Sequence, residues 1–283
     1  MKTYLDCYPC LLRQALSAAR RSGASDNQQH IILLKTMKEL SVFPTNSTPP
    51  QLAYRIHQCV QQLTSNLDPY RDDKDQSTQQ ALALYPELKK KVGAALDPLE
   101  MAVRIAIAGN IIDLGVAENY DLDATLKRVL TQDFAINDLA ALRSALAQNL
   151  SVLYIADNAG ETVFDRVLIE SLVCSVTYVV KSGPIINDAT YEDAVAAGID
   201  QVATIIDNGS NAPGTLFDQC SEEFLQRFNQ ADLIIAKGQA NYESLSDSSA
   251  PIFFLLQAKC NVIARDLGIS EGGIVLKQAS KQQ

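Results

Sequence analysis

The 283-residue sequence has no long hydrophobic run and no hydrophobic segment at its start. A helix that spans a bilayer needs roughly 18 to 20 consecutive apolar residues. The longest apolar candidate, residues 251–258, is only as long as a strand. Residues 1–6 lack the apolar region of a secretory signal. We therefore expect a cytoplasmic protein with no membrane partner.

The sequence also has fewer basic than acidic residues. Lysine and arginine total 24 against 33 acidic residues, which gives a net charge of -9. A protein that binds the phosphate backbone of nucleic acids normally needs a basic face, so we expect no nucleic-acid partner. A small anion is still compatible with this charge, because one metal ion or helix N-terminus can dominate the local field.

Cysteine and histidine are scarce, at six and two residues. In a cytoplasmic chain the cysteines predict reduced thiols or metal ligands rather than disulfides. Cys7 and Cys10 form a Cys-x-x-Cys pair, half of a zinc site, which Cys59 and His57 could complete if two predicted helices meet. A pair of unligated thiols at a helix start is the open alternative. A redox role is disfavoured, because the pair does not follow a strand.

The first half of the sequence has helical periodicity. Apolar residues recur at helical spacing in eight segments: 10–21, 28–40, 51–63, 77–84, 86–92, 98–111, 122–130 and 136–148. We expect residues 1–95 to form a helical N-terminal domain. The helices within 96–148 would lead the second domain, residues 96–283. The apolar stripes of the N-terminal helices predict a core or the surface of a homo-oligomer.

The second half alternates short apolar strands with helices. The expected strands are 152–156, 176–180, 202–206, 233–236 and 252–256. This alternation predicts right-handed βαβ units over residues 149–283 and a parallel sheet covered on both faces. The fold class is therefore α/β, with a three-layer α/β/α parallel-sheet domain behind a helical N-terminal domain.

Polar residues follow these strands closely. They are Asp157, Asn158, Asp188, Asp207, Asn208 and Lys237. The carboxyl ends of parallel strands meet at one edge of a sheet, where ligands bind. Carboxylate and amide oxygens suit Mg²⁺ or Mn²⁺, and a lysine suits a phosphate. The set predicts a metal or anion site for phosphoryl chemistry, although each Asp or Asn alone could instead cap a helix and Lys237 could be a solvated surface residue.

The strand-end residues also form motifs. Asp157-Asn158-Ala159-Gly160-Glu161 resembles the Asp-Asn-x-Gly-Glu motif of the metal-dependent damage-control phosphatases. This family, once a domain of unknown function, is also called acidic-residue methyltransferase-like. Further matches run in order along nearly the whole chain: Cys7-Tyr8-Pro9-Cys10 of the prokaryotic subfamily, Asp68-Pro69-Tyr70, Gly109-Asn110-Ile111-Ile112-Asp113, Asn187-Asp188-Ala189-Thr190, Lys237-Gly238-Gln239-Ala240-Asn241-Tyr242-Glu243 and residues 255–260 (LLQAKC).

The resemblance implies a role for each matching residue. Asp157, Asn158 and Asp188 match the metal ligands, and Lys237 matches a lysine that contacts the phosphate. Asn110 and Asp113 are expected to line the site, and Asn241 is expected to face the substrate. The backbone amide near Gly238 would bind the phosphate. Glu161 completes the first motif. A possible second metal site is Cys7 with Cys10.

The family implies metabolite repair, in which sugar phosphates and other damaged or unwanted phosphometabolites are hydrolysed with Mn²⁺, Co²⁺, Ni²⁺ or Mg²⁺. Metal-activated water and the carboxylate of Asp157 are both open as nucleophiles. A haloacid-dehalogenase-type phosphatase would carry an aspartate at position 159, where this chain has Ala159. That difference disfavours an aspartyl-phosphate route.

Two other functions stay open. An S-adenosylmethionine-dependent carboxyl methyltransferase is disfavoured, because residues 157–161 contain one glycine rather than a glycine-rich loop. A non-catalytic sensor of metal or phosphometabolites is disfavoured by intact matches at both the metal and the lysine positions. Residues 207–215, rich in turn formers, predict a plain connection, a lid or a loop that reads the substrate.

Overall fold

The computed structural model describes residues 1–283 except 45, 112–121, 149–150 and 281–283. Its described residues hold a seven-stranded sheet in the order β1-β7-β6-β5-β2-β3-β4. The strands are β1 Phe134–Asn137, β2 Val152–Ile155, β3 Val176–Val180, β4 Thr204–Asp207, β5 Leu233–Lys237, β6 Ile252–Gln257 and β7 Ile274–Gln278. The α/β fold class is therefore confirmed.

The sheet is mixed, which corrects the expectation of a parallel sheet. Strands β2 to β6 are parallel, whereas β7 pairs antiparallel with β6 and parallel with β1. After α12 (Asn261–Leu267) the chain returns to the carboxyl end of β6, where Ala258 N–H donates to the Gly273 carbonyl and Gly272 N–H to the Ala258 carbonyl. Because β7 starts at that end, it runs back along β6.

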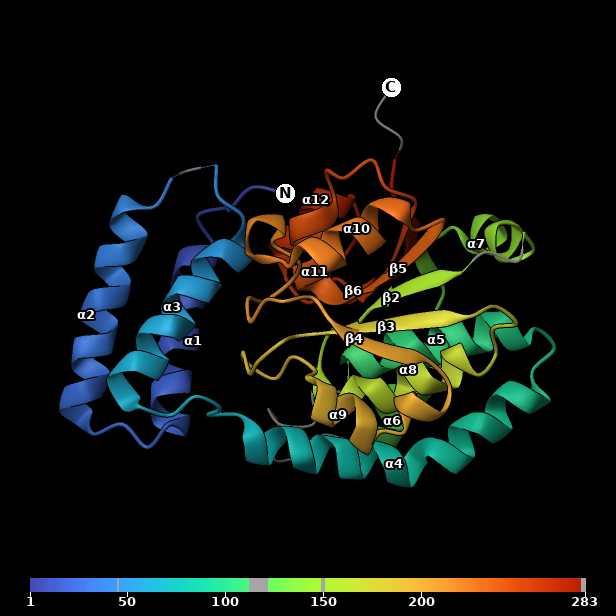
Figure 1. The fold of residues 1–283 in the computed structure, drawn as a ribbon, viewed down its shortest axis with the longest axis horizontal. Helices are drawn as coiled ribbons and strands as arrows, with labels where there is room; N and C mark the ends of the chain where they lie inside the picture. Colours follow the sequence, from blue (N-terminus) through green and yellow to red (C-terminus); the bar gives the residue numbers. More distant parts are fainter. Residues whose placement is uncertain (45, 112–121, 149–150, 281–283) are drawn as a thin grey trace.

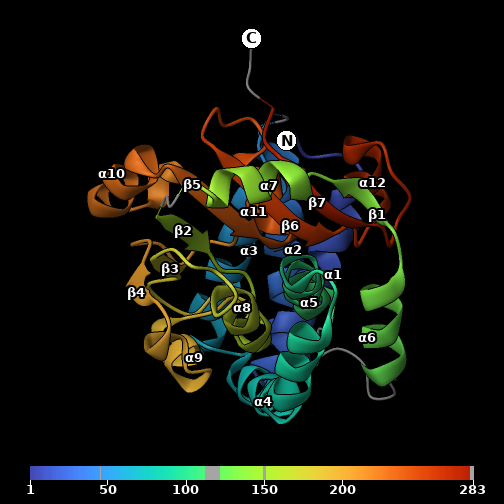
Figure 2. The ribbon, with the colours of Figure 1, turned by 90° about the vertical axis from the view of Figure 1, so that its right-hand side faces the viewer.

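Helices cover both faces of the sheet (Figure 2). Side chains alternate along β2, so Tyr154 packs on one face and Leu153 and Ile155 on the other. The Tyr154 face carries α5 Pro98–Ile111, α6 Leu122–Thr131, α7 Leu139–Leu146, α8 Thr162–Ile169 and α9 Tyr191–Ala196. The other face carries α10 Glu222–Gln230, α11 Gly238–Leu245 and α12.

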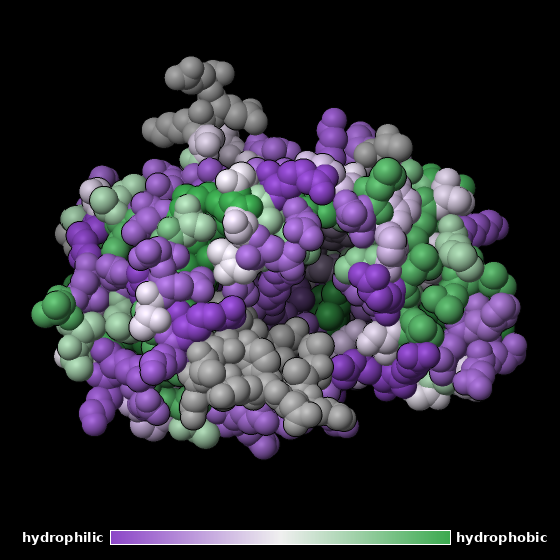
Figure 3. All heavy atoms as spheres, turned by 180° about the vertical axis from the view of Figure 1, so that it is seen from behind, coloured by the Kyte–Doolittle hydropathy of each residue, from purple (hydrophilic) through white to green (hydrophobic). Residues whose placement is uncertain are grey.

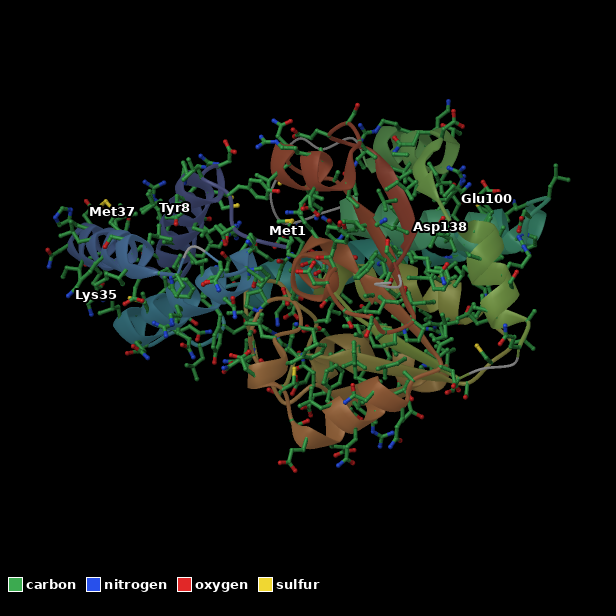
Figure 4. All side chains as sticks on the ribbon, turned by 90° about the horizontal axis from the view of Figure 1, so that it is seen from above. Met1, Tyr8, Lys35, Met37, Glu100 and Asp138 are labelled. Carbon is green, nitrogen blue, oxygen red and sulfur yellow. The ribbon has the colours of Figure 1, made fainter. Side chains whose placement is uncertain are left out.

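Three N-terminal helices form a separate bundle beside the α/β body (Figure 1). They are α1 Cys7–Arg21, α2 Asp26–Val42 and α3 Pro49–Thr64. Ser25 and Thr48 begin α2 and α3 through capping boxes. Figure 4 places Tyr8 and Met37 in the bundle and Met1 between the bundle and the body.

The next helix, α4 (Arg71–Ala94), belongs spatially to the α/β body. It lies outside α5 and α8 and contacts both (Figure 2). The two helices expected over 77–84 and 86–92 are one helix that continues through Pro86. Its buried Lys74 pairs with Asp68 and Asp193 at 3.1 and 3.2 Å. The domain boundary at residue 95 stays a prediction.

Strands β1 and β7 were absent from the expected elements. The helix expected over 136–148 begins only at Leu139, because Ile136 and Asn137 pair with Val275 and Leu276 of β7. Pairing with a distant strand overrides the local helical pattern. Within the described residues, no helix is both long and apolar enough to cross a membrane.

Candidate active site

The site begins where the chain changes direction across the sheet. From β2 the chain passes to β3 and β4 on one side, then to β5 and β6 on the other. The carboxyl ends of β2 and β5 therefore form a topological switch point, where α/β proteins bind ligands. Asp157 follows β2, and Gly238 follows β5 with φ +79°. A Cβ at Gly238 would lie 1.9 Å from Asp157 Oδ2, so only glycine leaves room for this carboxylate.

A second acidic loop is fixed against the first. Asn158 and Asp188 form an isolated antiparallel bridge. The Ala159 N–H donates to the Asn187 carbonyl at 2.8 Å, and the Ala189 N–H donates to the Asp157 carbonyl at 2.8 Å. These backbone bonds bring Asp157, Asn158 and Asp188 together, as the sequence predicted.

Two asparagines orient the carboxylates. Asn110 Nδ2 donates to Asp157 Oδ2 at 2.7 Å and to Glu161 Oε1 at 2.8 Å. Asn158 Nδ2 donates to the same two oxygens at 3.2 and 2.6 Å. Because the Asn158 amide nitrogen is engaged by acids, its oxygen stays available as a metal ligand.

Lys237 lies beneath these residues and has no exposed surface. Its Nζ donates to Glu161 Oε2 at 3.0 Å and to Asp165 Oδ1 at 2.7 Å. Tyr154 and Tyr178 each donate a hydroxyl hydrogen bond to Asp165 at 2.7 Å. Lys237 thus binds two buried carboxylates and offsets the charge of one of them, and the phosphate contact that the family implies for it stays a prediction.

Burial and mutual repulsion give the carboxylates unusual pKa values. Burial, then the charges of Glu161 and Asp188, raise the pKa of Asp157 well above its usual range. Burial likewise raises the pKa of Asp188 to about 6. Burial also acts to raise the pKa of Glu161, but Lys237, Lys259 and Asn110 together outweigh it and lower this pKa. The aspartates therefore favour a proton or another cation beside them.

The donor set fits a hard divalent metal. Asp188 Oδ2 is buried and accepts no hydrogen bond from the described residues, with Lys181 Nζ at 3.5 Å as its ion-pair partner. Two carboxylates and an amide oxygen are typical ligands of Mg²⁺ or Mn²⁺. No group of three or more His, Cys, Asp or Glu side chains in the described part of the chain is arranged to hold a metal. The candidate set depends on the Asn158 amide as its third protein ligand.

A cavity of about 240 Å³ opens over the acidic loops. Figure 3 shows a hollow between the bundle and the α/β body. The cavity is lined from the bundle by α1 and the start of α3, and from the body by the two acidic loops and α11. Lys259 also lines it, and its charge acts to lower the pKa values of Asp157 and Glu161. A lysine facing an acidic cavity supplies a positive charge for a bound phosphate.

The predicted site residues occupy three positions. Those that line the cavity are Asp157, Asn158, Asp188, Cys7 and Cys10. Those bonded to or packed on the acidic loops from beneath are Asn110, Glu161, Lys237 and Gly238. Asn241 is buried and bonds the Ala156 and Lys237 carbonyls and Thr215, and its substrate role stays a prediction. Asp113 lies outside the described residues.

Sequence reasoning missed Lys259 as a cavity residue. It lies two residues after β6, so the strand-end rule that selected Asp157 would also have selected it. Of the loop 207–215, Pro213 lines the cavity. Cys59 and His57 lie on α3, and neither lines the cavity with Cys7 and Cys10.

Comparisons with known proteins agree with this architecture. Residues 3–275 match the damage-control phosphatase ARMT1-like domain. The chain is 39% identical to a damage-control phosphatase of Archaeoglobus fulgidus, over 96% of this chain and 97% of that protein. It is 34% identical to the damage-control phosphatase PH1575 of Pyrococcus horikoshii, over 97% of both. The crystal structure of a DUF89 family protein from P. horikoshii has a TM-score of 0.91 at 33% identity, covering 99% of this chain and 100% of that one.

The fold and the site define an α/β protein with an acidic cavity at its topological switch point. The chain belongs to the damage-control phosphatase ARMT1-like family. The resemblance seen in the sequence motifs is therefore confirmed.

Proposed function

We propose that this protein is a metal-dependent phosphomonoesterase that hydrolyses small phosphorylated metabolites, including sugar phosphates and damaged phosphometabolites. The observation that carries the proposal is the backbone pairing of the Asp157–Asn158 loop with the Asp188 loop at the switch point, where Asp188 Oδ2 has Lys181 Nζ at 3.5 Å and accepts no hydrogen bond within the described residues. Membership of the damage-control phosphatase family supports hydrolysis of a phosphate ester.

Asp157, Asn158 and Asp188 would hold Mn²⁺, Co²⁺, Ni²⁺ or Mg²⁺. When bound, such an ion supplies a Lewis acid for a phosphate oxygen and lowers the pKa of bound water. Cys7 and Cys10 remain a possible second metal site. Both are half-buried free thiols, and the described part of the chain offers no third Cys, His, Asp or Glu ligand arranged around them.

The protein's own groups position the ester and balance its charge. Lys259 lines the cavity, where its charge acts on Asp157 and Glu161, and would bind the phosphate dianion there. Asn110 keeps Asp157 and Glu161 in fixed orientations through two hydrogen bonds. Lys237 holds Glu161 ionised from beneath. Water and the Asp157 carboxylate both remain candidate nucleophiles.

The test is phosphate release from a panel of phosphorylated metabolites after chelation and re-addition of each metal. We expect turnover that returns with metal and disappears in Asp157→Asn. We expect Lys259→Ala to raise KM by roughly 10- to 150-fold, since charged hydrogen bonds contribute about 1.5–3 kcal/mol. S-adenosylmethionine binding without phosphate release would favour the methyltransferase. Metal and metabolite binding without turnover would favour the sensor.

The proposal includes a small phosphorylated metabolite as the partner and the cytoplasm as the location. A homo-oligomer stays a prediction, which the mass of the protein in solution by light scattering would test.

A further inference from the structure

Asp165 is a buried acid beneath the site, and the proposed reaction does not use it. It belongs to α8, which begins at Thr162 directly after the first acidic loop, and its side chain has no exposed surface. Its carboxylate accepts hydrogen bonds from Tyr154 Oη, Tyr178 Oη and Lys237 Nζ, each at 2.7 Å. These donors come from β2, β3 and β5, so one carboxylate joins three neighbouring strands below the site.

The donors engage both oxygens of Asp165. Tyr178 binds Oδ2, whereas Tyr154 and Lys237 share Oδ1. The two tyrosine rings are stacked with their centroids 5.3 Å apart, and both side chains are fully buried. An ionised carboxylate only accepts hydrogen bonds. The two hydroxyl groups therefore hold Asp165 in one orientation, and Lys237 has a fixed partner beneath the site.

Lys237 connects this anchor to the first acidic loop. Its Nζ also donates to Glu161 Oε2 at 3.0 Å. Asn110 and Asn158 donate to the other oxygen, Glu161 Oε1, at 2.8 and 2.6 Å. Glu161 therefore cannot rotate without breaking a charge-assisted hydrogen bond. Because the amide nitrogen of Asn158 is bound to this anion, its amide oxygen is the atom that can bind a cation.

Stability alone is a weak reason for this arrangement. Replacing a buried ion pair by apolar residues of similar volume is often neutral or stabilising. The other residues that α8 buries around Asp165 are mainly apolar: Val163, Phe164, Val167, Leu168 and Ile169. Groups that hydrogen-bond the ligands of a metal ion orient those ligands and raise the affinity for the ion. The position of Asp165, two ion pairs below the acidic loop, fits such a role.

We propose that Asp165 is a positioning residue for the metal site, acting through Lys237 and Glu161 on the amide of Asn158. The inference rests on the proposed function, in which Asn158 is a ligand of the divalent ion. Without the charge of Asp165, Lys237 would keep one of the two carboxylates that it binds, Glu161. Its ammonium group would then compete with Asn158 for Glu161, and the amide would lose its fixed orientation.

The test variant is Asp165→Asn, which removes the charge and keeps the shape of the side chain. Glu170→Gln is the matched control, because Glu170 caps the end of the same helix and accepts a hydrogen bond from Tyr85 at 2.6 Å. Glu170 also pairs with Lys89 and Arg166. Among the described residues that line the cavity, none belongs to this second cluster.

Three measurements are made on chelated protein: a calorimetric Mn²⁺ titration, the visible absorption spectrum at saturating Co²⁺, and urea denaturation. Loss of a group that supports a metal ligand weakens affinity by about 10- to 100-fold. Asp165→Asn should therefore raise the Mn²⁺ dissociation constant about 10-fold, and it should alter the Co²⁺ spectrum because a ligand changes its orientation. Glu170→Gln should keep the wild-type constant and spectrum.

Two results would overturn the proposal. A lower stability of Asp165→Asn in urea with the wild-type constant and spectrum would assign Asp165 a structural role alone. A raised constant with an unaltered spectrum would assign it a long-range charge effect without positioning.

Tyr178→Phe decides the question if Asp165→Asn does not fold. This variant keeps the aromatic ring and removes one hydrogen bond that orients Asp165. It should raise the Mn²⁺ dissociation constant about threefold and alter the Co²⁺ spectrum, because one neutral donor is lost while both ion pairs stay. The wild-type constant and spectrum in Tyr178→Phe would then refute the anchoring role of Asp165.

Failure of the proposed function gives different results. A wild type that binds Mn²⁺ and releases no phosphate would refute the phosphatase, and the titrations would still decide the role of Asp165. A wild type that binds neither Mn²⁺ nor Co²⁺ would refute the metal site and the positioning role together. Metal binding that is equal in the wild type and Asp165→Asn would refute the positioning role alone.

Discussion

Replacing Gly238 with alanine tests whether backbone space beside Asp157 builds the site. Alanine at φ +79° costs about 1–2 kcal/mol, because the Cβ crowds the following carbonyl. The new Cβ would also lie 1.9 Å from Asp157 Oδ2, where a carbon–oxygen contact normally needs about 3.3 Å. The carboxylate must therefore move by more than 1 Å.

Gly268 supplies a matched control. It has φ +69°, and a Cβ there would meet nothing within 4 Å. Gly268→Ala should thus lose only about 1–2 kcal/mol of unfolding free energy. Gly238→Ala should lose about 1–3 kcal/mol more from overpacking. Urea denaturation of both variants measures the difference.

The larger effect is expected on function. A shift of about 1 Å at a reacting group can lower turnover by roughly 100-fold, and disturbing the support of a ligand weakens metal affinity by about 10- to 100-fold. Phosphate release and calorimetric Mn²⁺ titration of Gly238→Ala measure both. If Gly238→Ala matched Gly268→Ala in turnover and Mn²⁺ affinity, the close approach of Gly238 to Asp157 would have no role in the site.

Three further changes test the buried charges. Lys237→Met should destabilise the fold by about 3–5 kcal/mol in urea at pH 7, because Glu161 and Asp165 lose their shared cation; a loss below 1 kcal/mol would refute its neutralising role. Burial lowers the pKa of His57 from 6.5 to about 4, so the His57 contribution to stability, present above pH 6.5, should fall by about 3 kcal/mol as pH drops to 4. Burial raises the pKa of Glu243 from 4.5 to about 7, so the Glu243 contribution should decline by about 3 kcal/mol as pH rises through nearly the same window. The two contributions oppose each other in the wild type, and single variants separate them: between pH 4 and 7, stability should decline with rising pH in His57→Phe and increase with rising pH in Glu243→Gln. A variant whose pH profile matches the wild type would contradict the assignment for that residue.

The sequence predicted the centre of the fold well, because each of strands β2, β3, β5 and β6 is a run of apolar residues that needs burial on both faces. It did not predict β1 or β7. Ile136 continues a helical apolar pattern, and only pairing with Val275 makes it part of a strand. The strand conformation of Ile136 is therefore determined by β7 and cannot be read from the local sequence around Ile136.

The candidate site likewise has residues that the sequence predicted and residues that it did not. Asp157 and Asp188 could be found because strand ends converge in any open parallel sheet. The burial of Lys237 under Glu161 could not be predicted, since its position after β5 is equally compatible with a cavity-facing side chain. Gln14 could not be found either, because only the packing of α1 against the body brings it to the cavity.

We propose that Asp157, Asn158 and Asp188 bind one catalytic divalent metal. The most direct measurement is a calorimetric Mn²⁺ titration of chelated wild type, Asp188→Asn and the exposed control Asp232→Asn, with phosphate release recorded from the same samples. We predict binding and turnover together in the wild type and Asp232→Asn, and loss of both in Asp188→Asn. Full turnover in chelated protein, or wild-type Mn²⁺ affinity in Asp188→Asn, would contradict the claim.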